Sequence, residues 1–319
     1  MAKYLVTGGA GFIGSHLAEF LLKQGAQTAV LDDLSTGREE NVEALRGYPG
    51  FSFHRADLND AEALEKAMQG VEVVFHQAAL GSVARSVDNP RLTNRSNVDG
   101  SLAVFECARK LGVRRVVMAG SSSVYGDTRE LPMRESCMPR PVSPYAASKA
   151  AMELYARAYT ACFGVETVVL RYFNVFGPRQ NPRSQYAAVV AAFASACLAG
   201  EAPEIHGDGG QSRDFVYVGD VVRANFLAAQ AKGISHGVYN VGGGGTGASV
   251  KELFATISRL AGVAGMTPRR GAARPGDVRR TQADISLAAK DLGWKPQISL
   301  EEGLARTVDW FRQKAAVKR

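Results

Sequence analysis

Short apolar runs alternate with amphipathic stretches along the first half of the chain. Five of the runs are largely β-branched, and they span residues 4–6, 29–31, 73–75, 116–118 and 167–170. Between the first two runs, apolar side chains recur at helical spacing at Ile13, Leu17, Phe20 and Leu21. Continuous apolar runs of this length are typical of parallel strands that are buried on both faces. The alternation therefore predicts an α/β fold built on a doubly wound parallel sheet.

The pattern changes after about residue 172. Pro and Gly become frequent in stretches such as FGPRQNPRS and GEAPEIHGDGG, and the helical segments lose their regular order. This change predicts a sheet domain over residues 1–172 and a smaller, loop-rich C-terminal lobe over residues 173–319. One strand-like run, 238–241, is expected to rejoin the main sheet, so that the two domains interleave.

A cluster of glycines at 242–245 admits two interpretations. Next to a strand, such a cluster resembles a phosphate-binding loop. However, Ser249 and Glu252 have the spacing of a capping box, which would start a helix that carries Leu253, Phe254 and Ile257. We therefore expect the glycines to make the turn before this helix.

The composition is that of an ordinary globular protein. Of the 319 residues, 46% are hydrophobic and 22% are charged, which allows a large core. The net charge is +7 and the isoelectric point is about 9.3, but Lys and Arg are scattered rather than clustered. A scattered positive field favours anionic small molecules, rather than nucleic acid, as partners.

The cysteines and the first residues of the sequence indicate in which cellular compartment the protein works. Four cysteines lie far apart without the spacing of a metal site, which fits a reducing compartment. The given sequence begins MAKYLVTGG, directly in a predicted strand, so we expect no signal peptide, and no apolar run in it reaches membrane-spanning length. We expect a cytoplasmic protein with no bound metal and no membrane partner.

The stretch YLVTGGAGFIGSHLAEFLL holds the strongest local motif. Gly8, Gly11 and Gly14 lie between the first predicted strand and the first predicted helix. Glycine permits a tight turn and a close approach of the backbone to a diphosphate, which the N-terminus of the helix then faces. The order of strand, glycines, helix and second strand is that of a dinucleotide-binding, Rossmann-type domain.

The second predicted strand ends at Asp32, 18 residues after Gly14. A carboxylate at this place accepts hydrogen bonds from ribose hydroxyls and repels a 2′-phosphate, which favours NAD over NADP. Arg38 is close enough in the sequence to leave NADP open as an alternative. Asp57 and Leu58 would lie near the adenine if the run FSFH forms the third strand.

Tyr145 precedes Lys149 by four residues in the stretch SPYAASKAAMELY. On a helix, the two side chains would lie one turn apart on the same face. A surface tyrosine that merely stacks on a lysine stem has the same spacing. Alternatively, the ammonium makes the phenol a usable acid and base, and other parts of the chain have to decide between the two.

Several further stretches occur together with these motifs. In chain order they are HQAALGSV, NVDGS, SSSVYGD, RYFNVFGPRQ, GQSRDFVYV and RPGDVRRTQAD. With them, the chain resembles the extended short-chain dehydrogenase/reductase family, and more narrowly the nucleotide-sugar 4-epimerases, over nearly its whole length. The resemblance implies a tightly bound NAD, a UDP-sugar substrate and a homodimer.

The resemblance also implies roles for individual residues. Tyr145 would be the acid and base, Lys149 its electrostatic partner, and Ser121 a hydroxyl that assists Tyr145. NAD would contact Gly8, Gly11, Phe12, Ile13, Gly14, Asp32, Asp33, Ser35, Thr36, Gly37, Asp57, Leu58, Gln77, Ala78, Ala79, Asn97, Tyr145, Lys149 and Phe173. The substrate would contact Gly81, Ser82, Ser121, Ser122, Ser123, Tyr145, Gln180 and Thr281, with Asn174, Arg213, Arg274 and Asp277 on its UDP part.

The implied reaction is the 4-epimerisation of a UDP-hexose, and alternatives remain. A UDP-glucuronate 4-epimerase fits the same catalytic centre. In the resembling 4,6-dehydratases, Asp-Glu follows the catalytic hydroxyl, whereas Ser122 and Ser123 stand there in this chain; a decarboxylase is a further alternative. A non-catalytic dinucleotide-binding module commonly lacks the tyrosine or the lysine, and both are present here.

The segment RPGDVRRTQAD bears on the size of the sugar pocket. In the resembling epimerases, a tyrosine shortly after its GD crowds an N-acetyl group at the sugar C2, and this position falls on Thr281. Gly81 and Ser82 add little bulk beside the sugar, and the Gln180 amide can hydrogen-bond an acetamido group. The resemblance therefore favours UDP-N-acetylglucosamine as a substrate, with UDP-glucose beside it.

Overall fold

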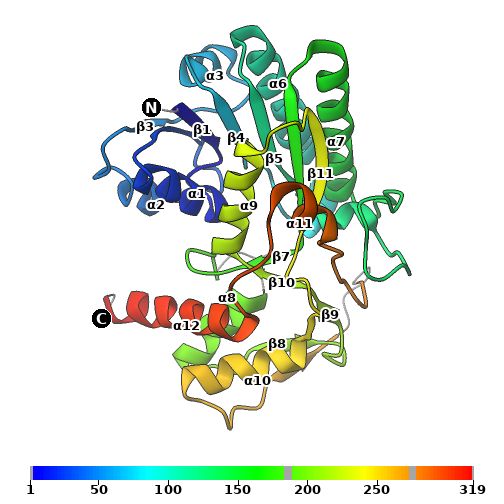
Figure 1. Ribbon diagram of the computed structural model, residues 1–319. Helices are drawn as coiled ribbons and strands as arrows, with labels where there is room; N and C mark the ends of the chain where they lie inside the picture. Colours follow the sequence, from blue (N-terminus) through cyan, green and yellow to red (C-terminus); the bar gives the residue numbers. More distant parts are fainter. Residues whose placement is uncertain (1–2, 183–188, 273–277, 318–319) are drawn as a thin grey trace.

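A seven-stranded parallel sheet with the order β11-β6-β5-β4-β1-β2-β3 forms the centre of the computed structural model, which describes residues 3–182, 189–272 and 278–317 (Figure 1). The strands are β1 (Lys3–Thr7), β2 (Gln27–Leu31), β3 (Phe51–His54), β4 (Val73–His76), β5 (Arg115–Ser121), β6 (Glu166–Tyr172) and β11 (His236–Val241). All five apolar runs that predicted strands lie in this sheet, which confirms the predicted α/β fold.

The central strands are buried on both faces. All of β5 is buried, and in β1 both Leu5 and Val6 have no exposed surface although they point to opposite faces. Leu5 belongs to the apolar cluster on one face, and Val6 belongs to the cluster on the other. This double burial explains why the strands read as continuous apolar runs rather than as alternating patterns.

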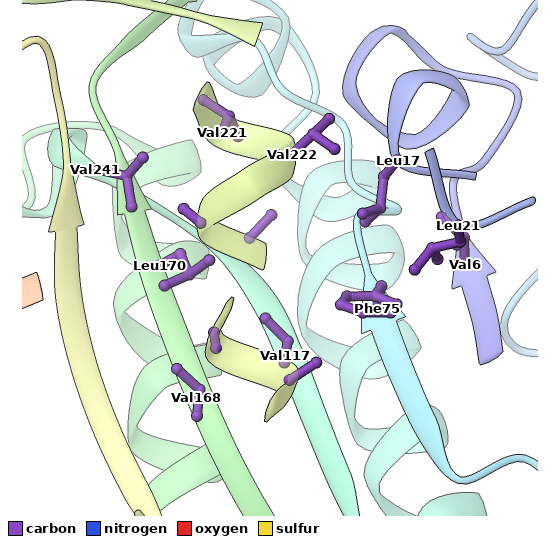
Figure 2. Packing of buried hydrophobic residues seen from close by; sticks show 14 of the residues in the cluster. Val6, Leu17, Leu21, Phe75, Val117, Val168, Leu170, Val221, Val222 and Val241 are labelled. Carbon is purple, nitrogen blue, oxygen red and sulfur yellow. The ribbon is translucent and has the colours of Figure 1, made fainter. Parts of the chain in front are cut away.

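Helices cover both faces of the sheet. α1 (Phe12–Lys23) and α9 (Val218–Gln230) pack against one face, where Leu17 and Val221 join the same cluster as Phe75 (Figure 2). α3 (Ala61–Met68), α6 (Gly100–Leu111) and α7 (Pro144–Phe163) pack against the other face. The carboxyl ends of the strands stay uncovered by these helices, and the functional residues gather there.

A smaller lobe lies below the sheet in Figure 1. Its core is formed by α8 (Val189–Ala199), α10 (Val250–Ala261) and α12 (Leu300–Val317). Two-stranded sheets join β10 (Phe215–Tyr217) to β7 (Asn174–Phe176), β12 (Ala248–Ser249) to β9 (Ser212–Arg213), and β13 (Arg269–Gly271) to β8 (Glu204–His206). The shorter helical segments are α2 (Glu39–Glu43), α4 (Val83–Asp88), α5 (Pro90–Asn94), the π-helix η1 (Arg95–Asp99), the 3₁₀ helix η2 (Ser122–Tyr125) and α11 (Ser286–Leu292).

The chain leaves the main sheet after β6 and returns to it with β11, which pairs in parallel with β6 at the sheet edge. Segments from before and after β11 contribute to the smaller lobe (Figure 1). The domain boundary at residues 172–173 stays a prediction.

The glycines at 242–245 belong to the turn that precedes α10. The helix begins with the expected capping box, since the Ser249 hydroxyl accepts from the backbone of Glu252 (3.2 Å) and the Glu252 carboxylate accepts from the backbone of Ser249 (2.8 Å). The backbone N–H of Gly243 donates to the buried carboxylate of Asp214. This glycine cluster therefore binds a carboxylate of the chain itself, as a structural turn does.

Candidate active site

A cavity of about 440 Å³ opens at the carboxyl ends of the central strands. It lies beside β1, where the chain order of the strands reverses, and doubly wound sheets bind their ligands at this point. The predicted residues that line it are Gly8, Gly11, Phe12, Ile13, Gly14, Asp32, Asp33, Ser35, Thr36, Asp57, Leu58, Gln77, Ala78, Ala79, Gly81, Ser121, Tyr145, Lys149, Phe173 and Gln180. The structure thus brings together residues from both ends of a 173-residue stretch, Gly8 to Gln180.

The glycine loop is packed too tightly for any side chain at two of its positions. Gly8 has a φ of +67°, and a Cβ there would lie 2.6 Å from the backbone nitrogen of Ala78. A Cβ on Gly14 would overlap the carbonyl oxygen of Gly8. At Gly11 the nearest protein atom to a Cβ is 3.1 Å away, so this glycine leaves space on the cavity side.

The N-terminus of α1 fits a diphosphate. Gly11 is its N-cap and supplies no capping side chain, and the first turn holds no acidic residue. The backbone N–H groups of this turn, near Phe12 and Ile13, therefore face the cavity together with the positive end of the helix dipole. These residues fit the diphosphate of NAD.

Asp32 directly follows β2 and lies next to the glycine loop. Its carboxylate accepts hydrogen bonds from the backbone of Ala10 (3.0 Å) and of Leu34 (2.9 Å). Burial raises the pKa of Asp32, and these two hydrogen bonds oppose the increase. Arg38, the alternative partner for a 2′-phosphate, is ion-paired with Glu40 and does not line the cavity.

The catalytic candidates come from β5 and α7. Ser143 caps α7 by accepting a hydrogen bond from the backbone of Ala146 (3.1 Å), so that Tyr145 lies in the first turn and Lys149 one turn later. Ser121, the last residue of β5, forms a side-chain hydrogen bond with Tyr145. The Lys149 ammonium donates to the carbonyl oxygen of Ala119 at 2.8 Å.

Burial shapes the acid–base properties of this group. Burial raises the pKa of Tyr145, and its hydrogen bond with Ser121 works in the opposite direction. Burial also lowers the pKa of Lys149 to about 8, although the carboxylate of Glu153 opposes the decrease. The arrangement can therefore move a proton at the Tyr145 oxygen beside a cationic neighbour.

Some of the predicted cofactor residues do not line the cavity. Gly37 packs on the carboxylate of Asp32, since a Cβ there would lie 2.6 Å from its oxygen. Asn97 is fully buried, accepts from the backbone of Leu80 (2.8 Å) and donates to the Ser148 hydroxyl (2.9 Å). The Asn97 side chain thus braces the cavity wall against α7.

Several predicted substrate residues also lie outside the cavity lining. The Ser82 hydroxyl caps α4 (3.2 Å to the backbone of Arg85). Ser123 is hydrogen-bonded to Ser121 (2.8 Å), and Ser122 lies beside it in η2. Of these three serines, Ser123 is therefore the one that hydrogen-bonds to a catalytic candidate, Ser121.

The lobe-side candidates converge on Asp214. The Asn174 amide donates to the carbonyl oxygen of Asp214 (3.2 Å). The backbone N–H of Asp214 donates to the hydroxyl of Thr281 (3.1 Å). Arg213 is the last residue of β9, directly before Asp214, and donates to the carbonyl oxygen of Ser212 (2.9 Å). Arg274 and Asp277 lie outside the described residues, and a role in UDP binding stays a prediction for all of these positions.

Other lining residues were not predicted, namely Leu31, Ala56, Leu80, Ser96, Ala119, Gly120, Tyr172 and Val175. Most of them stand at or just after the carboxyl ends of predicted strands. This position in the sheet is the signal that could have found them, because such ends face the ligand in doubly wound folds.

No helix in the described ranges is both long and apolar enough to cross a bilayer. Within the same ranges, no three His, Cys, Asp or Glu side chains are grouped so that they could hold a metal ion. The four cysteines are free thiols.

A dinucleotide-binding sheet that presents a tyrosine and a lysine to its ligand cavity defines an NAD-dependent enzyme. The profile of the NAD dependent epimerase/dehydratase family matches residues 4–242. The chain belongs to this family, and NAD is its cofactor. This finding confirms the resemblance on which the residue roles were based.

Relatives of known sequence and structure match nearly the whole length of the chain. The chain is 42% identical over 315 residues to a UDP-glucose 4-epimerase of Mycolicibacterium smegmatis, covering 98% of this chain and 99% of the relative. The structure of UDP-glucose 4-epimerase from Thermotoga maritima with UDP-glucose matches with a TM-score of 0.93 and 40% identity, covering 98% of this chain and 99% of that one. UDP-N-acetylglucosamine 4-epimerase from Methanobrevibacter ruminantium, in complex with UDP-N-acetylmuramic acid, matches with a TM-score of 0.92 at the same identity and coverage.

Proposed function

We propose that this protein is a UDP-hexose 4-epimerase that interconverts the C4 epimers of UDP-N-acetylglucosamine and of UDP-glucose. The observation that carries the proposal is the meeting of Ser121, Tyr145 and Lys149 at the cofactor cavity. The similarity to UDP-sugar 4-epimerases over nearly the full length supports the substrate class.

The chemistry follows from the residue types. NAD, when bound, accepts a hydride from C4 of the sugar and returns it. The Tyr145 phenolate takes the proton of the 4-hydroxyl, while Ser121 hydrogen-bonds the same oxygen. The ammonium of Lys149, one helical turn away, stabilises the phenolate, and Ser121 opposes the burial that raises the pKa of Tyr145. After the 4-keto sugar has turned in the site, Tyr145 returns the proton to the oxygen at C4.

The residues after β5 favour epimerisation over dehydration. Elimination of water from C5 and C6 requires an additional acid and base beside the sugar. Ser122 and Ser123 offer only hydroxyls, and the hydroxyl of Ser123 is engaged with Ser121 at 2.8 Å. A serine hydroxyl titrates far outside the range of general acid–base catalysis at neutral pH, so these two residues cannot replace a carboxylic acid pair.

Two residues at the cavity favour an acetamido group on the sugar. Gly81 lines the cavity, and a Cβ there would have no atom within 4 Å, so the wall is open at this point. Gln180 donates from its amide nitrogen to the carbonyl oxygen of Val175 (3.0 Å), whereas its buried amide oxygen has no partner among the described residues. A buried acceptor without a partner is costly, and the N–H of an acetamido group would satisfy it.

The proposal is tested by incubation with a panel of UDP-sugars and no added NAD. We expect equilibrium mixtures of C4 epimers from UDP-N-acetylglucosamine and UDP-glucose, with turnover driven by co-purified NAD. Conversion of UDP-glucuronate alone would replace the proposed substrate by the alternative one. A product lighter than its substrate would show dehydration or decarboxylation and refute epimerisation.

The assembly and the location stay predictions. A homodimer is expected from the resemblance, and light scattering of the purified protein would detect a monomer if that expectation fails. A cytoplasmic location is expected from the sequence alone, and cell fractionation would test it.

A further inference from the structure

Tyr145, Lys149 and Glu153 are spaced four residues apart along α7. Residues at this spacing follow one another along a single face of a helix, about 5–6 Å apart from Cβ to Cβ. Tyr145 and Lys149 line the cavity, and Glu153 lies one turn behind them, buried with 7% of its surface exposed. The proposed mechanism uses the first two residues and leaves the role of the third open.

Glu153 is held in an ion pair with Arg171 of β6. The guanidinium donates to both carboxylate oxygens, with distances of 2.7 Å from Nη2 to Oε2 and 3.0 Å from Nε to Oε1. Arg171 is itself buried, and its guanidinium stacks at 4.8 Å over the ring of Tyr125. The ion pair with Arg171 therefore holds the Glu153 carboxylate in place, one helical turn behind Lys149.

A buried ion pair of this kind is weak evidence for a role in stability. The desolvation of two charges commonly cancels their attraction, and an apolar pair of similar volume is often as stable or more stable. A structural explanation alone therefore does not account for two charges at this place. A demand for negative charge beside the buried ammonium of Lys149 accounts for Glu153, and Arg171 then holds this carboxylate in place.

The other groups around Lys149 do not supply that charge. On β4, His76 is neutral, since burial lowers its pKa to about 3. On η2, burial raises the pKa of Tyr125 to about 12, so its phenol is neutral as well. Glu135 accepts from the backbone of Asn240 (2.7 Å) at the far side of Tyr125, and it is not among the groups that shift the pKa of Lys149. Of these described neighbours, the Glu153 carboxylate is the group whose charge favours the ammonium form of Lys149.

We propose that Glu153 is a positioning residue of the epimerase: fixed by Arg171, its carboxylate keeps Lys149 charged, and Lys149 in turn stabilises the phenolate of Tyr145. The inference rests on the proposed function, because it assigns a task to a residue that does not touch the substrate. It predicts that the charge of Glu153, rather than its packing, is needed.

The test measures the ionisation of Lys149 directly. The protein is labelled with ¹³C at Cε of lysine, and the signal of Lys149 is assigned as the one that Lys149→Met lacks. In the NAD-bound enzyme, this signal is followed by NMR against pH, and the midpoint of its titration gives the pKa of Lys149. In Glu153→Gln we expect this midpoint to fall by about one to two pH units, as for a charge lost one helical turn away. The alkaline limb of the kcat profile should move to lower pH by the same amount. Glu153→Asp, which keeps the charge, should stay close to the wild type.

Two further variants separate charge from structure. Glu153→Leu/Arg171→Met removes both charges and keeps an apolar contact, so it should fold. Its Lys149 midpoint should lie between those of Glu153→Gln and the wild type, because the repulsion from the Arg171 guanidinium is lost as well. Glu106→Gln removes an exposed carboxylate on the neighbouring helix α6 and should leave the Lys149 midpoint unchanged.

An unchanged Lys149 midpoint in a folded Glu153→Gln protein overturns the inference. A lowered midpoint in a protein whose wild type epimerises no UDP-sugar would uphold the electrostatic link and refute the proposed function alone.

Discussion

Alanine at Gly14 and at Gly11 should have different consequences, because the chain itself fills the space at one position and the cofactor fills it at the other. At Gly14, a Cβ would overlap the carbonyl oxygen of Gly8 and lie 2.8 Å from its carbonyl carbon and 2.9 Å from Cα of Gly9. Carbon atoms in contact are separated by about 3.5–4.0 Å, so the loop has to move by almost 1 Å. Overpacking of this kind costs about 1–3 kcal/mol.

At Gly11, a Cβ has one protein atom within 4 Å, the carbonyl oxygen of Gly8 at 3.1 Å. A shift of a few tenths of an ångström relieves that contact, and the φ of −76° is open to alanine. The stability of the protein without NAD should therefore change little. The methyl group, however, lies at the helix N-terminus where the NAD diphosphate is expected, so Gly11→Ala should lose most of its NAD.

The assay is thermal unfolding of both variants, without and with added NAD, together with the NAD content of the purified proteins. Gly14→Ala should lower the Tm of the NAD-free protein by about 2–4 °C for each kcal/mol of lost stability. Gly11→Ala should keep that Tm and lose the increase that NAD gives the wild type, about 2.7 kcal/mol at a hundredfold excess over Kd. Gly265→Ala is the matched control, since Gly265 is exposed and a Cβ there has no neighbour within 4 Å. Retention of NAD by Gly11→Ala, or equal losses of Tm in both loop variants, would refute this reasoning.

Further predictions concern the catalytic and binding residues. Tyr145→Phe should keep the fold and the bound NAD but lower kcat by about 10²–10⁴-fold, because it lacks the proton acceptor; near-normal turnover would remove Tyr145 from the mechanism. The nucleotide released on denaturation should be NAD by mass, as Asp32 implies, whereas mainly NADP would point to Arg38 as the partner of a 2′-phosphate. Thr281→Tyr should depress turnover of UDP-N-acetylglucosamine and spare UDP-glucose, and equal losses would mean that Thr281 does not gate the pocket. Because burial lowers the pKa of Lys149 to about 8, kcat should fall as the pH rises through that value and the ammonium is lost; a kcat that stays constant well above it would contradict this assignment.

The fold could be predicted because its strands and its glycine loop can each be recognised from a short stretch of sequence. The run that became β5 is buried along its whole length, so continuous apolar character identified it without knowledge of its neighbours. The glycine loop is equally local, since Gly8 and Gly14 are restricted by atoms of the same turn and of the adjacent strand.

The exact contacts of the site could not be predicted, because they depend on what a side chain faces after the chain has folded. The resemblance implies that Asn97 contacts the cofactor, and this stays a prediction; its hydrogen bonds to the backbone of Leu80 and to the Ser148 hydroxyl follow only from how the chain folds. Similarly, nothing in the sequence links Glu153 to Arg171, because only the packing of α7 on β6 brings the two side chains together.

The central claim is that Tyr145 and NAD oxidise the sugar at C4 and reduce it again on the other face. The most direct test incubates the protein, without added NAD, with UDP-N-acetylglucosamine and UDP-glucose that carry deuterium at C4. We predict that both C4 epimers form at unchanged mass, with the deuterium still at C4, because the same hydride leaves and returns. Loss of the deuterium to solvent, loss of water or carbon dioxide, or no conversion of either sugar would contradict the account.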